Sequence, residues 1–140
     1  MIICDTNVLS ELMRGAPAPA VLDWISRQDT AVLFTTAMTQ AEVLYGLAIL
    51  PEGRRRVDLM AAARKTFEIE FSGRVLPFDT AAAEHFADIV STRRATGLPI
   101  SQIDAQIAAV ARSQSAVLAT RNVRDFVGCG IDIVDPWRAD

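Results

Sequence analysis

The chain has 140 residues and a formal net charge of −3, with 51% hydrophobic and 22% charged residues. A chain of this length and apolar content predicts one domain over residues 1–140 with a sizeable core. The acidic balance argues against binding bulk nucleic acid by counterion release, but it leaves room for an enzyme that reaches one phosphate through metal ions, or for a basic protein partner.

The sequence shows no segment for export or membrane insertion. No apolar run approaches the roughly 18 residues that span a bilayer, and the first residues lack a basic region followed by a long apolar region. Cys4 and Cys129 are far apart in sequence, and Cys4 lies in an apolar run, which favours a buried thiol over a disulfide. We therefore expect a cytoplasmic protein with no membrane association.

Short apolar runs alternate with helical periodicity along the whole chain. The first apolar run, residues 1–4, ends at Asp5, and a helical pattern follows it. Further helices are expected at 21–25, 39–50, 54–71, 80–95 and from 101; further strands are expected at 32–34, 74–78, 116–120 and 131–134, with a turn and short helix at 121–127. This alternation predicts an α/β fold, a three-layer α/β/α sandwich with a mostly parallel central sheet of about five strands.

Four acidic residues stand out by their positions in this pattern. Asp5 follows the first strand, and Asp125 lies just past the fourth. Glu42 and Asp104 lie in segments expected to begin helices. If the first and fourth strands are neighbours, Asp5 and Asp125 converge at the carboxyl edge of the sheet, where ligands bind in open α/β folds.

The same spacing has a structural explanation. Glu42, Asp104 and Asp125 each follow a capping-type residue by three positions, which resembles a capping box; these residues are Thr39, Ser101 and Asn122. Asp5 is also a suitable cap for the first helix. For any one acid, the structural explanation is at least as good as a functional one.

Taken together, the four acids also fit a metal site. Carboxylates gathered in one cleft raise each other's pKa, and a divalent cation offsets that repulsion. Mg²⁺ and Mn²⁺ prefer oxygen ligands. Such a site suits phosphodiester hydrolysis, because the metal activates water and stabilises the in-line transition state.

Four stretches resemble the PIN-domain family, and among its members most closely the VapC toxin ribonucleases of type II toxin–antitoxin systems, including their FitB-like relatives. These stretches are residues 4–11 (CDTNVLSE), 39–42 (TQAE), 103–108 (IDAQIA) and 119–126 (ATRNVRDF). The resemblance spans nearly the whole chain and includes the order and the neighbours of the acids. It implies a PIN-like fold and a metal-dependent endoribonuclease.

The resemblance also implies roles for individual residues. Asp5, Glu42 and Asp104 fall on three of the family's four acidic positions, with Asp5 and Asp104 the strongest candidates for direct ligands of Mg²⁺ or Mn²⁺. The fourth position differs, because Asn122 stands where some members carry an acid and Asp125 lies one helical turn on. Whether Asp125 reaches the metal directly, through water or not at all stays open. Asn7 and Thr120 match polar positions that support the cluster.

Several basic residues have two interpretations. Arg121 and Arg124 flank the fourth position, where they either position a phosphate or form ion pairs with the acids. Residues 54–56 are three consecutive arginines, which fit a solvated helix start better than an RNA or partner contact. His85 is the only histidine and lacks a second His or Cys at ligand spacing, so we expect it at the edge of its helix's packed face rather than in a zinc site.

Two other functions fit the sequence less well. A phosphohydrolase with a nucleophilic aspartate would want a second Asp two residues after Asp5, where this chain has Asn7. A catalytically silent PIN-type scaffold, acting only by binding protein or RNA, is disfavoured by the three intact acids. For partners, the resemblance implies an RNA substrate, a small VapB-like antitoxin with a DNA-binding region, and a homodimer within a hetero-oligomer.

Overall fold

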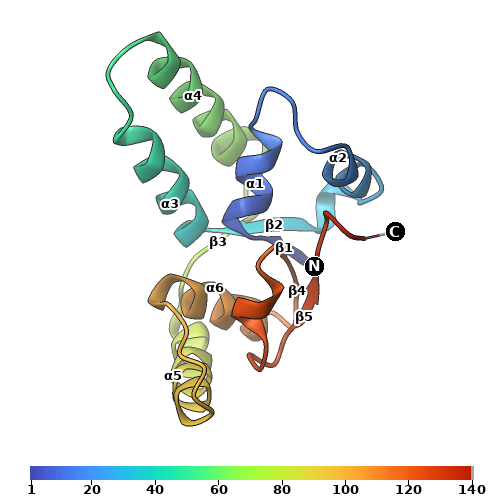
Figure 1. Cartoon of the computed structure of the whole chain (residues 1–140), viewed down its shortest axis with the longest axis vertical. Coiled ribbons are helices and arrows are strands. Elements are labelled where there is room, and N and C mark those ends of the chain that lie inside the picture. The colour runs from blue at the N-terminus through green and yellow to red at the C-terminus, as the bar shows by residue number, and fades with distance from the viewer. Residues whose placement is uncertain (140) are drawn as a thin grey trace.

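The computed structural model describes residues 1–139, and over this range a five-stranded sheet lies between two layers of helices (Figure 1). The strands are β1 (Ile2–Cys4), β2 (Leu33–Thr36), β3 (Val75–Leu76), β4 (Val117–Ala119) and β5 (Asp132–Val134). The α-helices are α1 (Thr6–Leu12), α2 (Pro19–Ser26), α3 (Ala37–Ala48), α4 (Arg54–Lys65), α5 (Thr80–Ala95) and α6 (Gln102–Ser113). Shorter helical segments are η1 (Thr30–Val32), η2 (Thr66–Glu70) and η3 (Val123–Phe126).

All neighbouring strands pair in parallel, in the order β3-β2-β1-β4-β5. The predicted three-layer α/β/α fold is therefore confirmed. Since β1 lies between β2 and β4, the residues that follow these three strands meet at one edge of the sheet. That edge carries Asp5, the start of α3 and the segment leading to η3.

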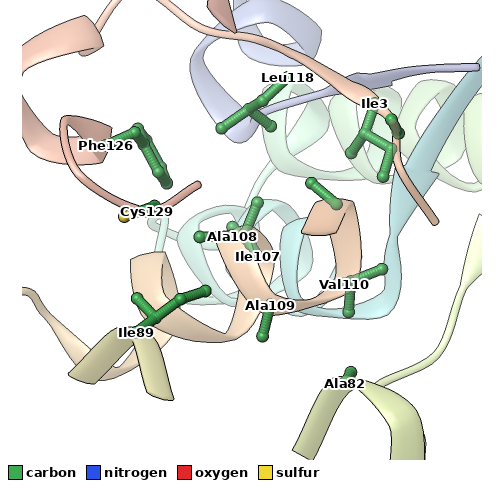
Figure 2. Packing of buried hydrophobic residues seen from close by; sticks show 12 residues of the cluster. Ile3, Ala82, Ile89, Ile107, Ala108, Ala109, Val110, Leu118, Phe126 and Cys129 are labelled. Atoms are coloured by element: carbon green, nitrogen blue, oxygen red, sulfur yellow. The ribbon is translucent and has the colours of Figure 1, made fainter. Parts of the chain in front are cut away.

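Side chains on the central strand alternate between two separate cores, as the pleat of a strand requires. Ile3 packs with residues of α5 and α6, including Ile89 and Ile107 (Figure 2). Cys4, the next residue, packs on the other face with α1, α2 and α3. Both faces of β1 are thus buried, which explains the continuous apolar run at residues 1–4. Both cysteines are buried free thiols, as expected.

Two of the differences from the predicted helix bounds have a clear physical cause. The helix expected from Thr39 begins at Ala37, because the Thr36 hydroxyl accepts the Thr39 N–H at 3.1 Å and caps it. The helix expected over 54–71 is regular only to Lys65, after which the N–H of Phe71 donates to the Thr66 carbonyl five residues back, in a wider π turn. Within residues 1–139, no helix is both long and apolar enough to cross a bilayer.

Candidate active site

Asp5 lies at the centre of the carboxyl edge and is held by three neighbours. Its Oδ1 accepts the Thr6 N–H at 2.8 Å, which caps α1. Its Oδ2 accepts the Thr120 hydroxyl at 2.8 Å and the Asn7 amide at 3.3 Å. The capping role expected for Asp5 is therefore real, but it uses only one carboxylate oxygen. The other oxygen is held by residues that follow β1 and β4.

The carboxyl group of Asp5 is costly to ionise in this position. Only 3% of the residue is exposed, and burial raises the pKa of Asp5 from its ordinary 3.8 to about 6. The hydrogen bonds from Thr120 and Thr6 oppose that rise, whereas the charges of Asp104 and Glu42 add to it. The three carboxyl groups therefore share one electrostatic environment.

Glu42 reaches the site from α3, where it is half-buried. Its Oε1 accepts the Thr6 hydroxyl at 2.7 Å, and that hydroxyl also lies 3.1 Å from the Thr39 hydroxyl. The predicted capping box with Thr39 is wrong, because Thr39 lies inside α3 and Thr36 is the cap. Glu42 is consequently in the second turn of the helix, and its side chain contacts α1 rather than its own helix start.

Asp104 lies in the first turn of α6, half-buried, and Ser101 caps that helix as predicted. The Asp104 N–H donates to the Ser101 hydroxyl at 3.2 Å. Burial raises the pKa of Asp104, the Ser101 hydrogen bond lowers it, and the charges of Asp125 and Glu42 raise it again. Arg93 acts in the opposite direction and lowers the pKa. Asp104 therefore lies within electrostatic reach of the other acids.

Asp125 is exposed on η3, and Asn122 precedes that helix. The predicted capping box is again absent, since the Asn122 side chain makes no capping hydrogen bond. Instead, the Asn122 backbone N–H donates to the Thr120 hydroxyl at 3.1 Å. Asp125 affects the site electrostatically, because its negative charge raises the pKa of Asp104. Its role as a fourth ligand stays a prediction.

Asn7 and Thr120 connect these elements. The Asn7 amide lies 3.2 Å from the Thr120 hydroxyl oxygen, and its carbonyl oxygen accepts the Arg121 N–H at 3.1 Å. The start of α1 is thereby fixed to the segment after β4. Every buried side-chain nitrogen or oxygen within residues 1–139 has a hydrogen-bond partner, so this network holds together as it stands.

The arginines near the fourth position are not paired with the acids. Among the described residues, Arg121 and Arg124 form no ion pair within 4.0 Å; instead, the Arg121 guanidinium lies over the Trp137 ring, 5.0 Å from its centroid. Of the two interpretations of these residues, ion pairing is thus not observed. Trp137 was not predicted as a site residue, because nothing in its local sequence indicates that it meets the segment after β4.

A buried arginine was also missed. Arg93 is 6% exposed on α5, where its Nε donates to the Leu98 carbonyl at 2.6 Å and its Nη1 donates to the Val127 carbonyl. It therefore ties the loop before α6 to the loop after η3, the elements that carry Asp104 and Asp125. The helical spacing around Arg93 could have placed it on the buried face of α5 with Ile89.

The remaining candidates lie elsewhere. His85 is half-buried on α5 and lines a separate cavity with Arg112, consistent with the edge position expected for it. Arg54 pairs with Asp58 on its own exposed helix start. Arg55 lines a cavity of about 550 Å³ that also includes Glu42, so this one residue of the arginine run faces the region of the site.

The donor set fits a hard divalent cation in its chemistry. Asp5, Glu42 and Asp104 offer only carboxylate oxygens, which Mg²⁺ and Mn²⁺ prefer. No three His, Cys, Asp or Glu side chains in the described part of the chain form a group that would hold one ion directly. A full protein cage is not required, because Mg²⁺ keeps several waters and is commonly held by one or two carboxylates. The residues present fit that mode of binding.

The comparisons with known proteins agree on one family. Residues 2–127 match the family model described as PIN domain. The chain is 39% identical to "VapC ribonuclease Y4jK" of Sinorhizobium fredii, over 98% of each chain. It is 34% identical to "Toxin FitB" of Neisseria gonorrhoeae, over 98% of this chain and 99% of that one. A structure described as FitAB bound to an IR36 DNA fragment superposes with a TM-score of 0.94 and 33% identity, covering 100% of this chain and 98% of the other.

Proposed function

This chain belongs to the PIN-domain family, and we propose that it is the toxin of a type II toxin–antitoxin pair, an endoribonuclease that hydrolyses RNA phosphodiester bonds with Mg²⁺ or Mn²⁺. One observation carries the catalytic part of this proposal. The buried carboxyl of Asp5 shares its electrostatic environment with Glu42 and Asp104, which come from two other elements. Three carboxylates that repel one another at the carboxyl edge of a parallel sheet are suited to hold a cation.

The residues of the site have separate tasks. Asp5 and Asp104 would hold the ion, with Glu42 holding it or one of its waters. When bound there, Mg²⁺ or Mn²⁺ would supply an activated water and offset the charge that develops on the phosphate. Thr120 and Asn7 orient the Asp5 carboxylate by hydrogen bonds, and Thr6 does the same for Glu42. These contacts fix the carboxylates before substrate arrives, which limits the reorganisation needed during the reaction.

The relatives' names support a toxin in a complex. The FitAB structure is a two-protein assembly on DNA, and a small antitoxin with a DNA-binding region would take the corresponding place here, with the toxin present as a homodimer. The cavity beside Glu42, lined by α1, α3 and α4, is suited to an antitoxin segment because its walls are largely apolar, including Val43 and Leu47. A basic side chain of that segment would pair with Glu42 or Asp104. We propose that such a toxin acts on cellular RNA in the cytoplasm.

Controlled expression in a bacterial host, followed by mapping of RNA 5′ ends, tests the proposal. Growth arrest with discrete new 5′ ends is expected for the wild-type chain and not for Asp104→Asn produced at the same level. If both chains leave growth and RNA ends unchanged, the ribonuclease proposal fails and a catalytically silent scaffold becomes the better explanation. If both arrest growth without new ends, toxicity arises from something other than RNA hydrolysis.

A further inference from the structure

A second concave surface lies beside the acidic site. The segment after β4 and the segment after β5 enclose a cavity of about 810 Å³, a volume within the roughly 300–1,000 Å³ typical of ligand sites. Three arginines and one tryptophan line it, namely Arg121, Arg124, Arg138 and Trp137. We refer to this surface as the arginine groove. It includes η3, which contacts α6 (orange-red in Figure 1).

The charge of the arginine groove differs from that of the whole chain. Three arginines face two aspartates, Asp125 and Asp135, although the chain has a net charge of −3. Asp135 lies 3.9 Å from Arg138 and also accepts the Trp137 N–H at 2.9 Å, so one acid is already occupied within the groove. Arg121 and Arg124 have no ion-pair partner within residues 1–139. They are therefore free to meet an anion from outside.

The groove also offers a flat platform. The Arg121 guanidinium lies over the Trp137 indole at 5.0 Å, and Trp137 is partly buried against the core that contains Trp24. Guanidinium planes and aromatic rings are the two surfaces on which proteins stack unpaired bases. The two groups in contact, next to further arginines, offer a surface for a base together with contacts for phosphates. A peptide partner would use the charges but has no special need for the guanidinium and indole together.

Two chains of hydrogen bonds join the groove to the acidic site. The Arg121 N–H donates to Asn7, whose amide also contacts Asp5. The Asn122 N–H donates to the Thr120 hydroxyl, which donates to Asp5. Residues 120–122 thus form both the rim of the groove and the support of the Asp5 carboxylate. A single-stranded nucleic acid lying in the groove would continue directly to the acidic site.

We propose that the arginine groove binds a single-stranded RNA segment beside the scissile phosphodiester, with one base stacked on the Arg121–Trp137 platform and the flanking phosphates on Arg124 and Arg138. This inference rests on the proposed ribonuclease function and adds the path of the substrate to it. It assigns the arginines to substrate binding and positioning, since none of them is placed among the acids that would act on the phosphodiester.

The test is a binding titration with a short fluorescein-labelled single-stranded RNA of mixed sequence. The full chain carries Asp5→Asn so that the RNA stays intact. Adding Arg124→Ala and Arg138→Ala, which removes the two proposed phosphate contacts, should weaken binding and reduce the slope of log affinity against log salt by about 1.4, at roughly 0.7 per phosphate contact on a single strand. The matched control adds Arg27→Ala and Arg54→Ala, two exposed arginines at the end of α2 and at the start of α4, and should keep the slope.

A fluorescence measurement isolates the stacking. The chain has two tryptophans, and Trp24 is only 5% exposed, so quenching by bound RNA should come from Trp137. Replacing Trp137 by Leu keeps apolar bulk, should abolish the quenching, and should weaken binding about 5- to 150-fold if one base is stacked. Quenching that persists in Trp137→Leu contradicts the platform.

The outcomes separate this inference from the function it rests on. Unchanged affinity and salt slope in the Arg124 and Arg138 variant overturn the inference. If the wild-type chain binds RNA through the groove yet does not cleave it, the proposed hydrolysis fails and the groove assignment stands. If it cleaves RNA while the groove variants bind normally, only the inference fails.

Discussion

The Thr120 hydroxyl donates a hydrogen bond of 2.8 Å to Oδ2 of Asp5, joining two residues 115 positions apart. The contact exists because β1 and β4 are parallel neighbours that end at the same edge. It gives Asp5 a donor that favours its charged form inside a buried site. The geometry of the candidate active site therefore depends directly on the order of strands in the sheet.

Replacing Thr120 by Val removes this donor while keeping the shape of the side chain. The Asp5 pKa should then rise above about 6, and Mn²⁺ affinity at neutral pH should fall about 10- to 100-fold, as is typical when an outer-shell partner is lost. Titration calorimetry with Mn²⁺ measures the effect. Thr35→Val is the control, since the Thr35 hydroxyl is equally buried but donates to the Cys4 carbonyl. Equal affinity in the two variants contradicts the role given to Thr120.

The raised pKa of Asp5 also predicts a pH-dependent cost to stability. Between pH 3.8 and about 6 the folded chain holds the Asp5 proton more tightly than the unfolded chain, so this group's contribution falls as pH rises through that window. Asp5→Asn removes this pH-dependent cost but also loses the acceptor for Thr120 and Asn7. The stability of the variant relative to wild type should therefore rise by about 1–3 kcal/mol between pH 4 and neutral pH. Urea unfolding of the wild type and the variant across this pH range, with a metal chelator present, measures the difference in stability. A stability gain of Asp5→Asn over wild type that grows toward acid pH would contradict the predicted direction of the pH dependence.

The fourth acidic position is decided by comparing Asp125 with Asn122. Asp125→Asn should lower the pKa of Asp104, because the Asp125 charge raises it, and should slow RNA cleavage less than Asp104→Asn does, because Asp125 is exposed. Asn122→Ala should change little, since only its backbone N–H contacts Thr120. Carboxyl NMR and cleavage rates provide the readouts. Loss of activity in Asp125→Asn as complete as in Asp104→Asn would make Asp125 a direct participant.

Arg93 should matter for stability far more than its neighbour. Arg93→Met leaves the Leu98 and Val127 carbonyls without their side-chain donor. Because both residues are about half exposed, water can replace part of each bond, and we expect a cost of about 1–3 kcal/mol in total. Arg94→Met, at the adjacent exposed position, should cost less than about 0.5 kcal/mol. Chemical denaturation compares the two. Similar unfolding free energies would show that Arg93 does not hold the two loops together.

Much of the site could be predicted from the sequence because strand ends are marked by local pattern. The apolar run before Asp5 and the strand before Thr120 indicated where the sheet edge lies, and parallel pairing brought the two together. The cap at Ser101 was also readable, since a serine precedes a clear helical period.

The features of the site that the sequence does not predict depend on contacts between distant segments. Thr36 and Thr39 are equally good caps by residue type, and only the end of β2 decides between them. Trp137 becomes part of a groove because the segment after β5 returns beside Arg121. Arg93 is buried by loops from two other elements. Helical spacing could place Arg93 on the buried face of α5, but no local pattern shows which distant segments meet there.

Cleavage of RNA by the purified chain, with and without divalent metal, tests the central claim most directly. Wild type should cut a defined RNA in Mg²⁺ or Mn²⁺ and stop when the metal is chelated, whereas Asp5→Asn should lose at least about 100-fold in rate, since losing even an outer-shell partner costs 10- to 100-fold. Circular dichroism confirms that the variant is folded. Cleavage that survives both chelation and Asp5→Asn would contradict the account.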